Sequence, residues 1–302
     1  MIKKAVVTGA CGFIGHALTH RLIKDGVAVT AIDLACPIGH DPHNIQVCDI
    51  TQPNSLDPLL DKDCTIFHMA ASADVGRSVK NPVLDYNINL LGYLHVLESA
   101  RIHNCRVIFP STASIYDSNN PLPLTERSYV SPSSPYGAAK VAGEAYSRAY
   151  STSYGLDIRI ARMFSVYGIG MNRFAIYDMA QRILKNPKEL SIFGDGNQIR
   201  DYLYIDDVVD GLIMIATNGA VGEDYNLASG NPVKIIDLAK MISSLMGRPD
   251  IKIIPSGEFI KGETKRWYGD ISKIKGIGFN PKVSFEDGLK KTIDWLKKNV
   301  KK

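Results

Sequence analysis

Short apolar runs alternate with longer, periodically apolar segments over the first half of the chain. The runs, rich in Val and Ile, have the pattern of buried strands, whereas apolar residues spaced three and four apart indicate amphipathic helices. The expected strands are 5–8, 27–32, 45–50, 65–71, 106–109 and 157–164, and the expected helices are 13–25, 53–60, 82–103 and 135–154. Because strands and helices alternate, we expect a doubly wound α/β fold with a parallel sheet.

The pattern changes after about residue 165. Helical spacing continues in some segments, but the strand patterns between them are shorter and more polar. The expected helices are 174–184, 208–216, 235–245 and 285–296, the expected strands are 190–193, 225–227 and 251–254, and 194–202 is expected to be a loop. No Pro- or Ser-rich linker divides the chain, so we expect a smaller α/β substrate-binding lobe (166–202 and 229–302) folded against the first domain (1–165, with 203–228 returning to it).

Composition and charge leave this picture unchanged. The chain has 302 residues, of which 45% are hydrophobic and 22% charged, with a net charge of +4, as is ordinary for a globular protein. Lys and Arg are spread along the chain, so nothing indicates a nucleic-acid partner. The five cysteines are odd in number and contain no Cys-x-x-Cys, so neither a disulfide framework nor a metal site is expected. The first apolar run is too short for a signal peptide or a membrane span, so we expect a cytoplasmic protein without a membrane partner.

Three glycines follow the first expected strand, at Gly9, Gly12 and Gly15, and the first expected helix begins among them. Asp33 ends the next strand. Strand, glycine turn, helix, strand and acid form the dinucleotide-binding unit of a Rossmann fold, in which the helix N-terminus faces the pyrophosphate. A carboxylate at Asp33 suits ribose hydroxyls and repels a 2′-phosphate, which favours NAD over NADP. The alternatives are a tight turn without a ligand and an acid that only caps its strand.

Tyr136 and Lys140 lie four residues apart on the helix that begins after Ser134, so both side chains share one helix face. A nearby ammonium and the positive end of the helix dipole both favour the phenolate, which makes the tyrosine a usable proton acceptor. Of the 14 tyrosines in the chain, only Tyr136 has a lysine at this spacing, although one such pair is also expected by chance. His68, at the end of the fourth strand, fits a core position better than a catalytic one.

In order and spacing, these motifs resemble the extended short-chain dehydrogenase/reductase family, and within it the nucleotide-sugar epimerases and dehydratases. The resemblance spans nearly the whole chain. It is carried by 8–15, 68–71, 89–92, Ser111 and Thr112 with Tyr136 and Lys140, and 194–202.

The resemblance implies a role for three sets of residues. The catalytic set is Tyr136, Lys140 and Thr112. The set implied to hold NAD is Gly9, Gly12, Phe13, Ile14, Gly15, Asp33, Asp49, Ile50, Ala70, Ala71, Ser72, Asn89, Ser111, Tyr136, Lys140 and Met163. The set implied to bind a nucleotide-diphosphate sugar is Thr112, Tyr136, Ser165, Asn172, Arg173, Phe193, Arg200 and Arg266. An arginine fork suits phosphate oxygens, although Arg200 also fits an interdomain salt bridge.

Three positions depart from the family pattern. Ser165 stands where asparagine is usual, so its contact with the substrate is in doubt. Ile260 stands where many relatives have arginine, which leaves Arg266 as the nearer substitute. Trp267 falls where side-chain bulk limits the group at C2 of the sugar, which favours a plain hydroxyl over an N-acetyl group, although a core position fits equally well.

The residues after Thr112 discriminate between reactions. Related 4,6-dehydratases and sugar-acid decarboxylases carry carboxylates there, because their chemistry needs an additional acid or base. This chain has Ala113 and Ser114. We therefore expect an NAD-dependent 4-epimerase acting on a UDP-hexose or UDP-hexuronic acid through a transient 4-keto sugar. The alternatives are an NAD(P)-dependent 4-keto nucleotide-sugar reductase and, with less support, a non-catalytic dinucleotide-binding scaffold. The resemblance also implies a homodimer formed through the helices 82–103 and 136–154.

Overall fold

The computed structural model describes residues 2–35, 45–259, 262 and 264–299. Its centre is a seven-stranded sheet in the order β3-β2-β1-β4-β5-β6-β10, in which every neighbouring pair is parallel. The strands are β1 (Lys4–Thr8), β2 (Ala28–Asp33), β3 (Gln46–Val47), β4 (Thr65–His68), β5 (Arg106–Thr112), β6 (Ile158–Met163) and β10 (Asp224–Leu227). The order reverses direction at β1, where β2 and β4 lie on opposite sides, as in a doubly wound Rossmann sheet.

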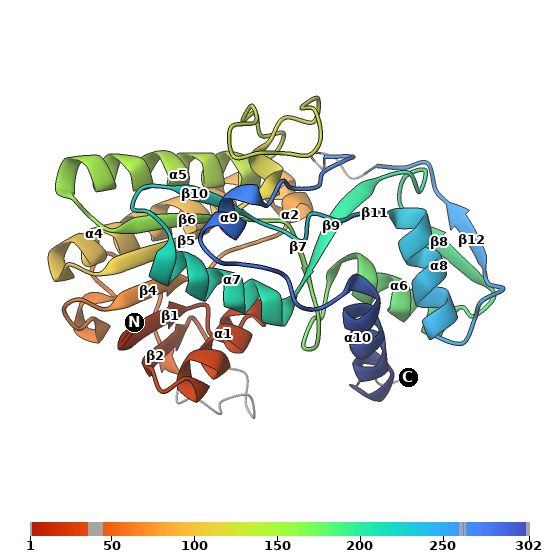
Figure 1. Ribbon diagram of the computed structural model, residues 1–302, viewed down its shortest axis with the longest axis horizontal. Coiled ribbons are helices and arrows are strands. Elements are labelled where there is room, and N and C mark those ends of the chain that lie inside the picture. The colour runs from red at the N-terminus through yellow and green to blue at the C-terminus, as the bar shows by residue number, and fades with distance from the viewer. Residues whose placement is uncertain (1, 36–44, 260–261, 263, 300–302) are drawn as a thin grey trace.

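Helices cover both faces of this sheet (Figure 1). The flanking helices are α1 (Phe13–Lys24) and α7 (Ile205–Asn218) on one face, and α4 (Gly92–His103) and α5 (Pro135–Tyr154) on the other. Alternate residues of β1 point to opposite faces of the sheet. Val7 packs with Leu18 of α1 on one face, whereas Val6 packs with Tyr93 of α4 on the other. The near-continuous apolar pattern of the strands therefore reflects burial on both sides. Within the described residues, no helix is long and apolar enough to cross a membrane.

Several expected elements are shorter or divided. The strand expected over 45–50 is only β3, and the helix expected over 53–60 is a 3₁₀ turn at Asp57–Leu59. The helix expected over 82–103 consists of α3 (Pro82–Tyr86), a π-helical segment (Asn87–Leu91) and α4. A further helix, α2 (Val75–Lys80), precedes it and has Asp74 as its N-cap. The π-helical segment changes the helical register, which no apolar periodicity signals.

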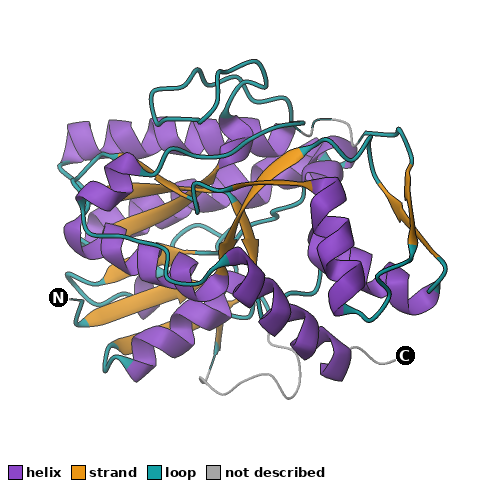
Figure 2. Ribbon diagram, turned by 45° about the vertical axis from the view of Figure 1, so that its right-hand side comes forward, coloured by secondary structure: helices purple, strands orange, loops and turns teal. Residues whose placement is uncertain are grey.

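The second lobe contains a three-stranded sheet, β11-β9-β7, and a parallel pair, β8 and β12 (Figure 2). Its strands are β7 (Ser165–Tyr167), β8 (Glu189–Ile192), β9 (Ile199–Tyr204), β11 (Pro232–Lys234) and β12 (Lys252–Pro255), and its helices are α6 (Phe174–Lys185), α8 (Ile235–Leu245) and α10 (Phe285–Asn299). The expectation of a loop over 194–202 was wrong from Ile199 onward. The polar residues of β9 are buried because strands pair with it on both sides. With β10 and α7 in the first sheet and its covering layer, we propose that 203–228 belongs to the first domain.

Asp201 of β9 joins the second lobe to two distant loops. Its fully buried carboxylate accepts hydrogen bonds from Ser229 N (2.8 Å), Ser229 Oγ (2.6 Å), Gly230 N (2.9 Å) and Gly269 N (3.1 Å). Burial raises the pKa of this carboxyl, whereas the hydrogen bonds from the four donors lower it in part. The loop after β10 and the chain before α9 (Ser272–Gly276) are thus fixed to one side chain.

We expect Asp201→Ala to lower the free energy of unfolding by about 3 kcal/mol, because it leaves buried backbone donors without an acceptor. Denaturant unfolding followed by circular dichroism measures the change. Asp237→Ala is the control, since Asp237 is exposed and pairs with exposed Lys240. A loss for Asp201→Ala within about 0.5 kcal/mol of this control would show that the buried network does not stabilise the fold.

Candidate active site

The glycine turn lies where β1 and β4 end side by side. Gly9 has φ +66°, and a Cβ on it would lie 2.6 Å from Ala70 N, so the two strand ends approach this closely only with glycine. A Cβ on Gly15 would lie 2.0 Å from Gly9 O, so the first turn of α1 packs directly on the loop. Gly12, the N-cap of α1, has no side chain to cap the helix. The result is a helix N-terminus at the crevice of the sheet, which suits a pyrophosphate.

Asp33 has a structural role at this edge of the sheet. Its carboxylate accepts hydrogen bonds from Cys11 N (2.9 Å) and Leu34 N (2.7 Å), which ties the end of β2 to the glycine turn. The alternative that Asp33 caps its strand is therefore correct, since its carboxylate accepts two backbone hydrogen bonds there. The carboxylate also stands beside the turn, where a ribose hydroxyl would find an acceptor.

Asn89, in the π-helical segment, holds the chain after β4. Its Oδ1 accepts from Ser72 N (2.9 Å), and its Nδ2 donates to Ser72 O (3.1 Å) and to Asp85 Oδ1 (2.8 Å). Ala70 N donates to Thr8 Oγ1 (3.0 Å), which fixes the start of the same segment. The residues expected to run beside a cofactor, 70–72, are thus held rigidly at the crevice.

Asp49 and Ile50 follow β3 on the far side of the turn. Hydrogen bonds from the Thr51 hydroxyl and Thr51 N lower the pKa of the Asp49 carboxyl, so this group is charged at neutral pH. Ile50 is buried against Gly92 at the start of α4. Because Ile50 is packed in the core, Asp49 is the better candidate of the two for contact with a ligand.

Tyr136, Thr112 and Lys140 meet where α5 packs on β5. Ser134 caps α5, since its Oγ accepts from Gly137 N (3.2 Å), which places Tyr136 in the first turn as expected. The Thr112 hydroxyl lies near the Tyr136 phenol and lowers its pKa. Lys140 is 2% exposed, and its ammonium donates to Pro110 O at 2.7 Å.

The electrostatics of Tyr136 differ from the expectation. Burial raises its pKa to about 12, whereas the nearby Thr112 hydroxyl and the charge of Arg173 lower it in part. Burial lowers the pKa of Lys140 to about 8, against the carboxylates of Asp85 and Glu144. The predicted depression of the tyrosine pKa by Lys140 is therefore wrong for the protein alone, because desolvation outweighs the helix dipole and the ammonium is directed to Pro110 O.

Asp85 is a site residue that the sequence reasoning missed. It is 3% exposed, and its Oδ2 is buried without a hydrogen-bond partner among the described residues. Its charge raises the pKa values of Lys140 and Tyr136, while burial raises its own. A signal was available, since an acid and an amide four residues apart on one helix face can hydrogen-bond.

Two residues at the strand ends are buried. His68 is 1% exposed, contacts Thr8 Oγ1 through Nδ1 (3.2 Å) and lies against the Tyr93 ring at a tilt, and burial lowers its pKa to about 3. It is therefore a neutral core residue, as preferred. Ser111 is fully buried, and its Oγ has no hydrogen-bond partner among the described residues. Met163, at the end of β6, is the register neighbour of Thr112.

The expected substrate residues of the second lobe divide by exposure. Ser165 is half-buried at the start of β7, and Arg200 is 7% exposed. Those with exposed side chains are Asn172, Arg173, Phe193 and Arg266. Two of the latter take part in cation–π contacts, since Arg173 stacks on Phe174 and Phe193 lies beneath Arg182.

Arg200 stacks on Trp267, with its guanidinium carbon 4.2 Å from the ring centroid, and donates to Ile199 O and Lys265 O. Trp267 itself belongs to the core, and its buried Nε1 has no partner among the described residues. The core alternative therefore describes Trp267. Ile260 lies outside the described residues.

Comparison with known proteins gives consistent matches. The sequence model of the NAD dependent epimerase/dehydratase family matches residues 5–228. A putative UDP-glucose 4-epimerase of Methanocaldococcus jannaschii is 32% identical over 305 residues, which cover 97% of this chain and 98% of that protein.

Solved structures support the same assignment. A UDP-glucose 4-epimerase of Thermotoga maritima, solved with UDP-glucose, superimposes with a TM-score of 0.91 at 30% identity, over 99% of this chain and 100% of that one. A UDP-glucose 4-epimerase of Thermus thermophilus, solved with NAD, superimposes with a TM-score of 0.89 at 27% identity, over 98% and 100%. These similarities confirm the expected fold class.

The buried ammonium predicts a pH-dependent gain in stability for Lys140→Met. With the Lys140 pKa lowered from 10.5 to about 8, charge burial costs the folded state about 3 kcal/mol below pH 8. Loss of the hydrogen bond to Pro110 O offsets about 1 kcal/mol of this cost. We therefore expect Lys140→Met to be more stable than the natural chain by about 2 kcal/mol at pH 7.

The sign of the pH dependence is fixed by linkage. Between pH 8 and 10.5 the unfolded chain binds a proton that the folded chain does not, so the natural protein gains on the variant as the pH rises. Denaturant unfolding at pH 7 and pH 10 measures the difference, with Lys240→Met as the exposed control. A variant that is less stable at pH 7, or equally advantaged at both pH values, would contradict the prediction.

Proposed function

Because this chain belongs to the NAD-dependent epimerase/dehydratase family, we propose that it is a nucleotide-sugar 4-epimerase with NAD as its cofactor. The observation that carries this choice is the pairing of Tyr136 with Thr112 at the end of β5, with no carboxylate on the following turn. Ala113 is buried, and the Ser114 hydroxyl accepts from Thr112 Oγ1. Elimination of water or loss of a carboxyl group needs an additional acid or base, which this turn does not supply.

The residues of the crevice fit the cofactor. Gly9 and Gly15 leave the N-terminus of α1 open, Asp33 offers ribose acceptors, and Ser111 has a buried hydroxyl available for a hydrogen bond. NAD, when bound, supplies the acceptor and donor of the C4 hydride.

The chain's own residues would orient the sugar and move one proton. Thr112 positions the C4 oxygen, and Tyr136 takes its proton as the 4-keto sugar forms and returns it after the sugar has turned over. Lys140, mostly protonated at neutral pH with a pKa of about 8, keeps positive charge on the same helix face as the phenol. The hydrogen returns to the opposite face of C4, which inverts that carbon.

For the substrate we propose a UDP-hexose or a UDP-hexuronic acid. The relative from M. jannaschii and the T. maritima structure are both named for UDP-glucose. Phe193 offers an exposed ring for a base, and Arg200 and Arg266 offer charge for the diphosphate.

Substrate assays test the reaction directly. Purified protein is incubated without added cofactor with UDP-glucose, UDP-galactose, UDP-glucuronate and their N-acetyl relatives, and C4 inversion is followed by chromatography. We expect inversion of a plain hexose or hexuronate, a decrease of roughly 10³-fold in kcat for Tyr136→Phe, and no change for the 70%-exposed control Tyr129→Phe.

Three outcomes would overturn parts of this proposal. If none of these sugars is inverted at C4, the proposed 4-epimerase activity is excluded. Turnover only with stoichiometric NAD(P)H and a 4-keto sugar, by a protein that releases its cofactor, would establish the reductase. Full activity of Tyr136→Phe would exclude every reaction centred on this phenol.

We also propose a homodimer formed through α3, α4 and α5. These helices carry exposed apolar side chains, with exposed fractions of 72% for Val83, 57% for Ile102, 43% for Tyr146 and 58% for Tyr154. Several exposed apolar groups on helices that already cover the sheet are typical of a surface that packs against a second copy.

The dimer has its own test. We expect the natural chain to sediment as a dimer and Val83→Asp with Tyr146→Asp to sediment as a monomer, since each interface would bury four carboxylates. Val221→Asp is the matched control, because Val221 is also exposed (52%) but lies on the turn before β10. A monomeric natural chain, or a doubly substituted chain that stays dimeric, would contradict the proposed interface.

A further inference from the structure

Two cysteines lie together at the amino edge of the central sheet. Cys64 directly precedes β4 and Cys105 directly precedes β5. Thr65 and Arg106 are register partners in these parallel strands, so the two cysteines are neighbours across the ladder. Their sulfur atoms are 2.8 Å apart, both thiols are reduced, and the residues are 2% and 1% exposed. The site described above lies at the opposite, carboxyl edge.

We propose that Cys64 and Cys105 form a reversible intrachain disulfide that cross-links β4 to β5 under oxidising conditions. The proposal concerns a modification site and does not depend on the proposed function.

The backbone is already arranged for this bond. Neighbouring strands lie about 4.8 Å apart, within the range of roughly 4.4–6.8 Å found for the Cα atoms of disulfides. Arg106 N donates to Cys64 O (2.9 Å), which holds the strand starts in register. The side chains point to the same side, as their contact shows. The bond therefore needs only side-chain adjustment.

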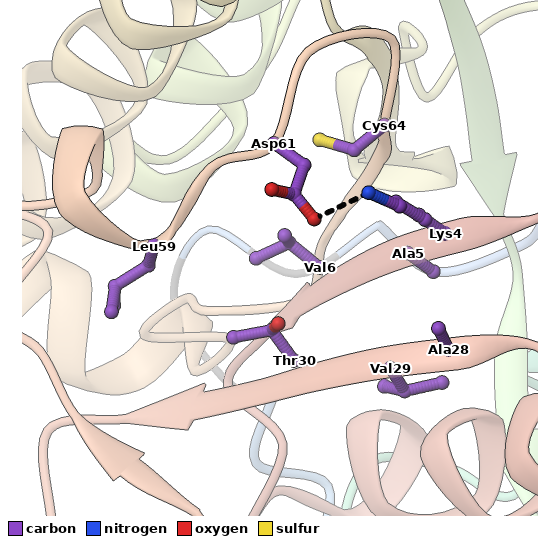
Figure 3. Close-up of a pocket in the computed structure, with 9 residues that line it drawn as sticks. All are labelled: Lys4, Ala5, Val6, Ala28, Val29, Thr30, Leu59, Asp61 and Cys64. Carbon is purple, nitrogen blue, oxygen red and sulfur yellow. Dashed lines mark hydrogen bonds and ion pairs between the residues drawn. The ribbon is translucent and has the colours of Figure 1, made fainter.

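A route for an oxidant reaches Cys64. This residue lines a pocket together with Lys4, Val6, Thr30 and Asp61. In Figure 3 the Cys64 sulfur lies beside the Lys4–Asp61 ion pair (2.9 Å) at the edge of this pocket. Cys105 Sγ donates to Asp61 O at 3.3 Å.

With hydrogen peroxide as the oxidant, the chemistry balances. The Cys64 thiolate attacks one peroxide oxygen, which gives a sulfenic acid and one water. The Cys105 thiolate then displaces the second water and forms the S–S bond. Two thiols lose two electrons and two protons, and one peroxide becomes two waters.

The relative acidities slow the first step and favour the second. The hydrogen bond from Cys64 lowers the pKa of Cys105, which favours it as the resolving nucleophile. The same hydrogen bond and burial raise the pKa of Cys64, so its first step is slow and requires sustained exposure to the oxidant.

The experiment uses the natural chain with its cofactor. The protein is treated with hydrogen peroxide or, separately, with oxidised glutathione, then alkylated and digested without reductant for mass spectrometry. We expect a Cys64–Cys105 cross-linked peptide lighter by two hydrogens than the sum of its reduced parts, which dithiothreitol removes. We also expect Tm to rise by roughly 5 °C, because the bond restricts the unfolded chain, with turnover unchanged.

Matched variants assign the effect. Cys64→Ala and Cys105→Ala should abolish both the cross-link and the rise in Tm, whereas Cys48→Ala, which removes another buried thiol, should retain both. Two unmodified thiols after both treatments, or a cross-link between other cysteines, would overturn the proposal. The mass measurement on the natural chain decides this even if a variant fails to fold.

Discussion

The buried ammonium of Lys140 constrains the architecture around it. It sits between α5 and β5, over the Phe109 ring (4.8 Å to the centroid) and within 2.7 Å of Pro110 O. A charge buried away from water needs fixed hydrogen-bond and ionic partners within the protein, because water cannot solvate it there. Gly143, one turn further along α5, provides the closeness, since a Cβ there would lie 2.5 Å from Phe109 Cζ. The same contact between helix and strand brings Tyr136 to the Thr112 hydroxyl.

Asp85 provides the negative charge near this ammonium, and the π-helical segment links it to the crevice. Because Asn89 bonds both Asp85 and the backbone of Ser72, one amide connects the charge balance at Lys140 with the chain after β4. The Asp85–Asn89 contact has the four-residue spacing of an ordinary helix face, so the π-turn is not what brings these two side chains together. The π-helical segment instead shifts the register of the helix that follows it.

The sequence predicted the features that depend on local chemistry. The glycine spacing, the acid at Asp33 and the Ser134 cap each have a reason within a few residues, and the structure has the turn and the cap as expected. It did not predict features that depend on distant chain. β9 looks like a loop because its buried Asp201 is polar, yet its partners come from 229–230 and Gly269. The Tyr136 pKa is set mainly by burial, which only tertiary packing determines.

That pKa bears on how the two lobes cooperate. In the proposed reaction Tyr136 must accept a proton near neutral pH, while burial holds its pKa at about 12. Arg173, at the start of α6 in the second lobe, lowers this pKa, whereas Asp85 in the first lobe raises it. Arg173 is itself exposed and stacked on Phe174. Desolvation therefore outweighs the positive charge around the phenol in the protein alone, and the proposed role as a base requires that further positive charge lie beside it.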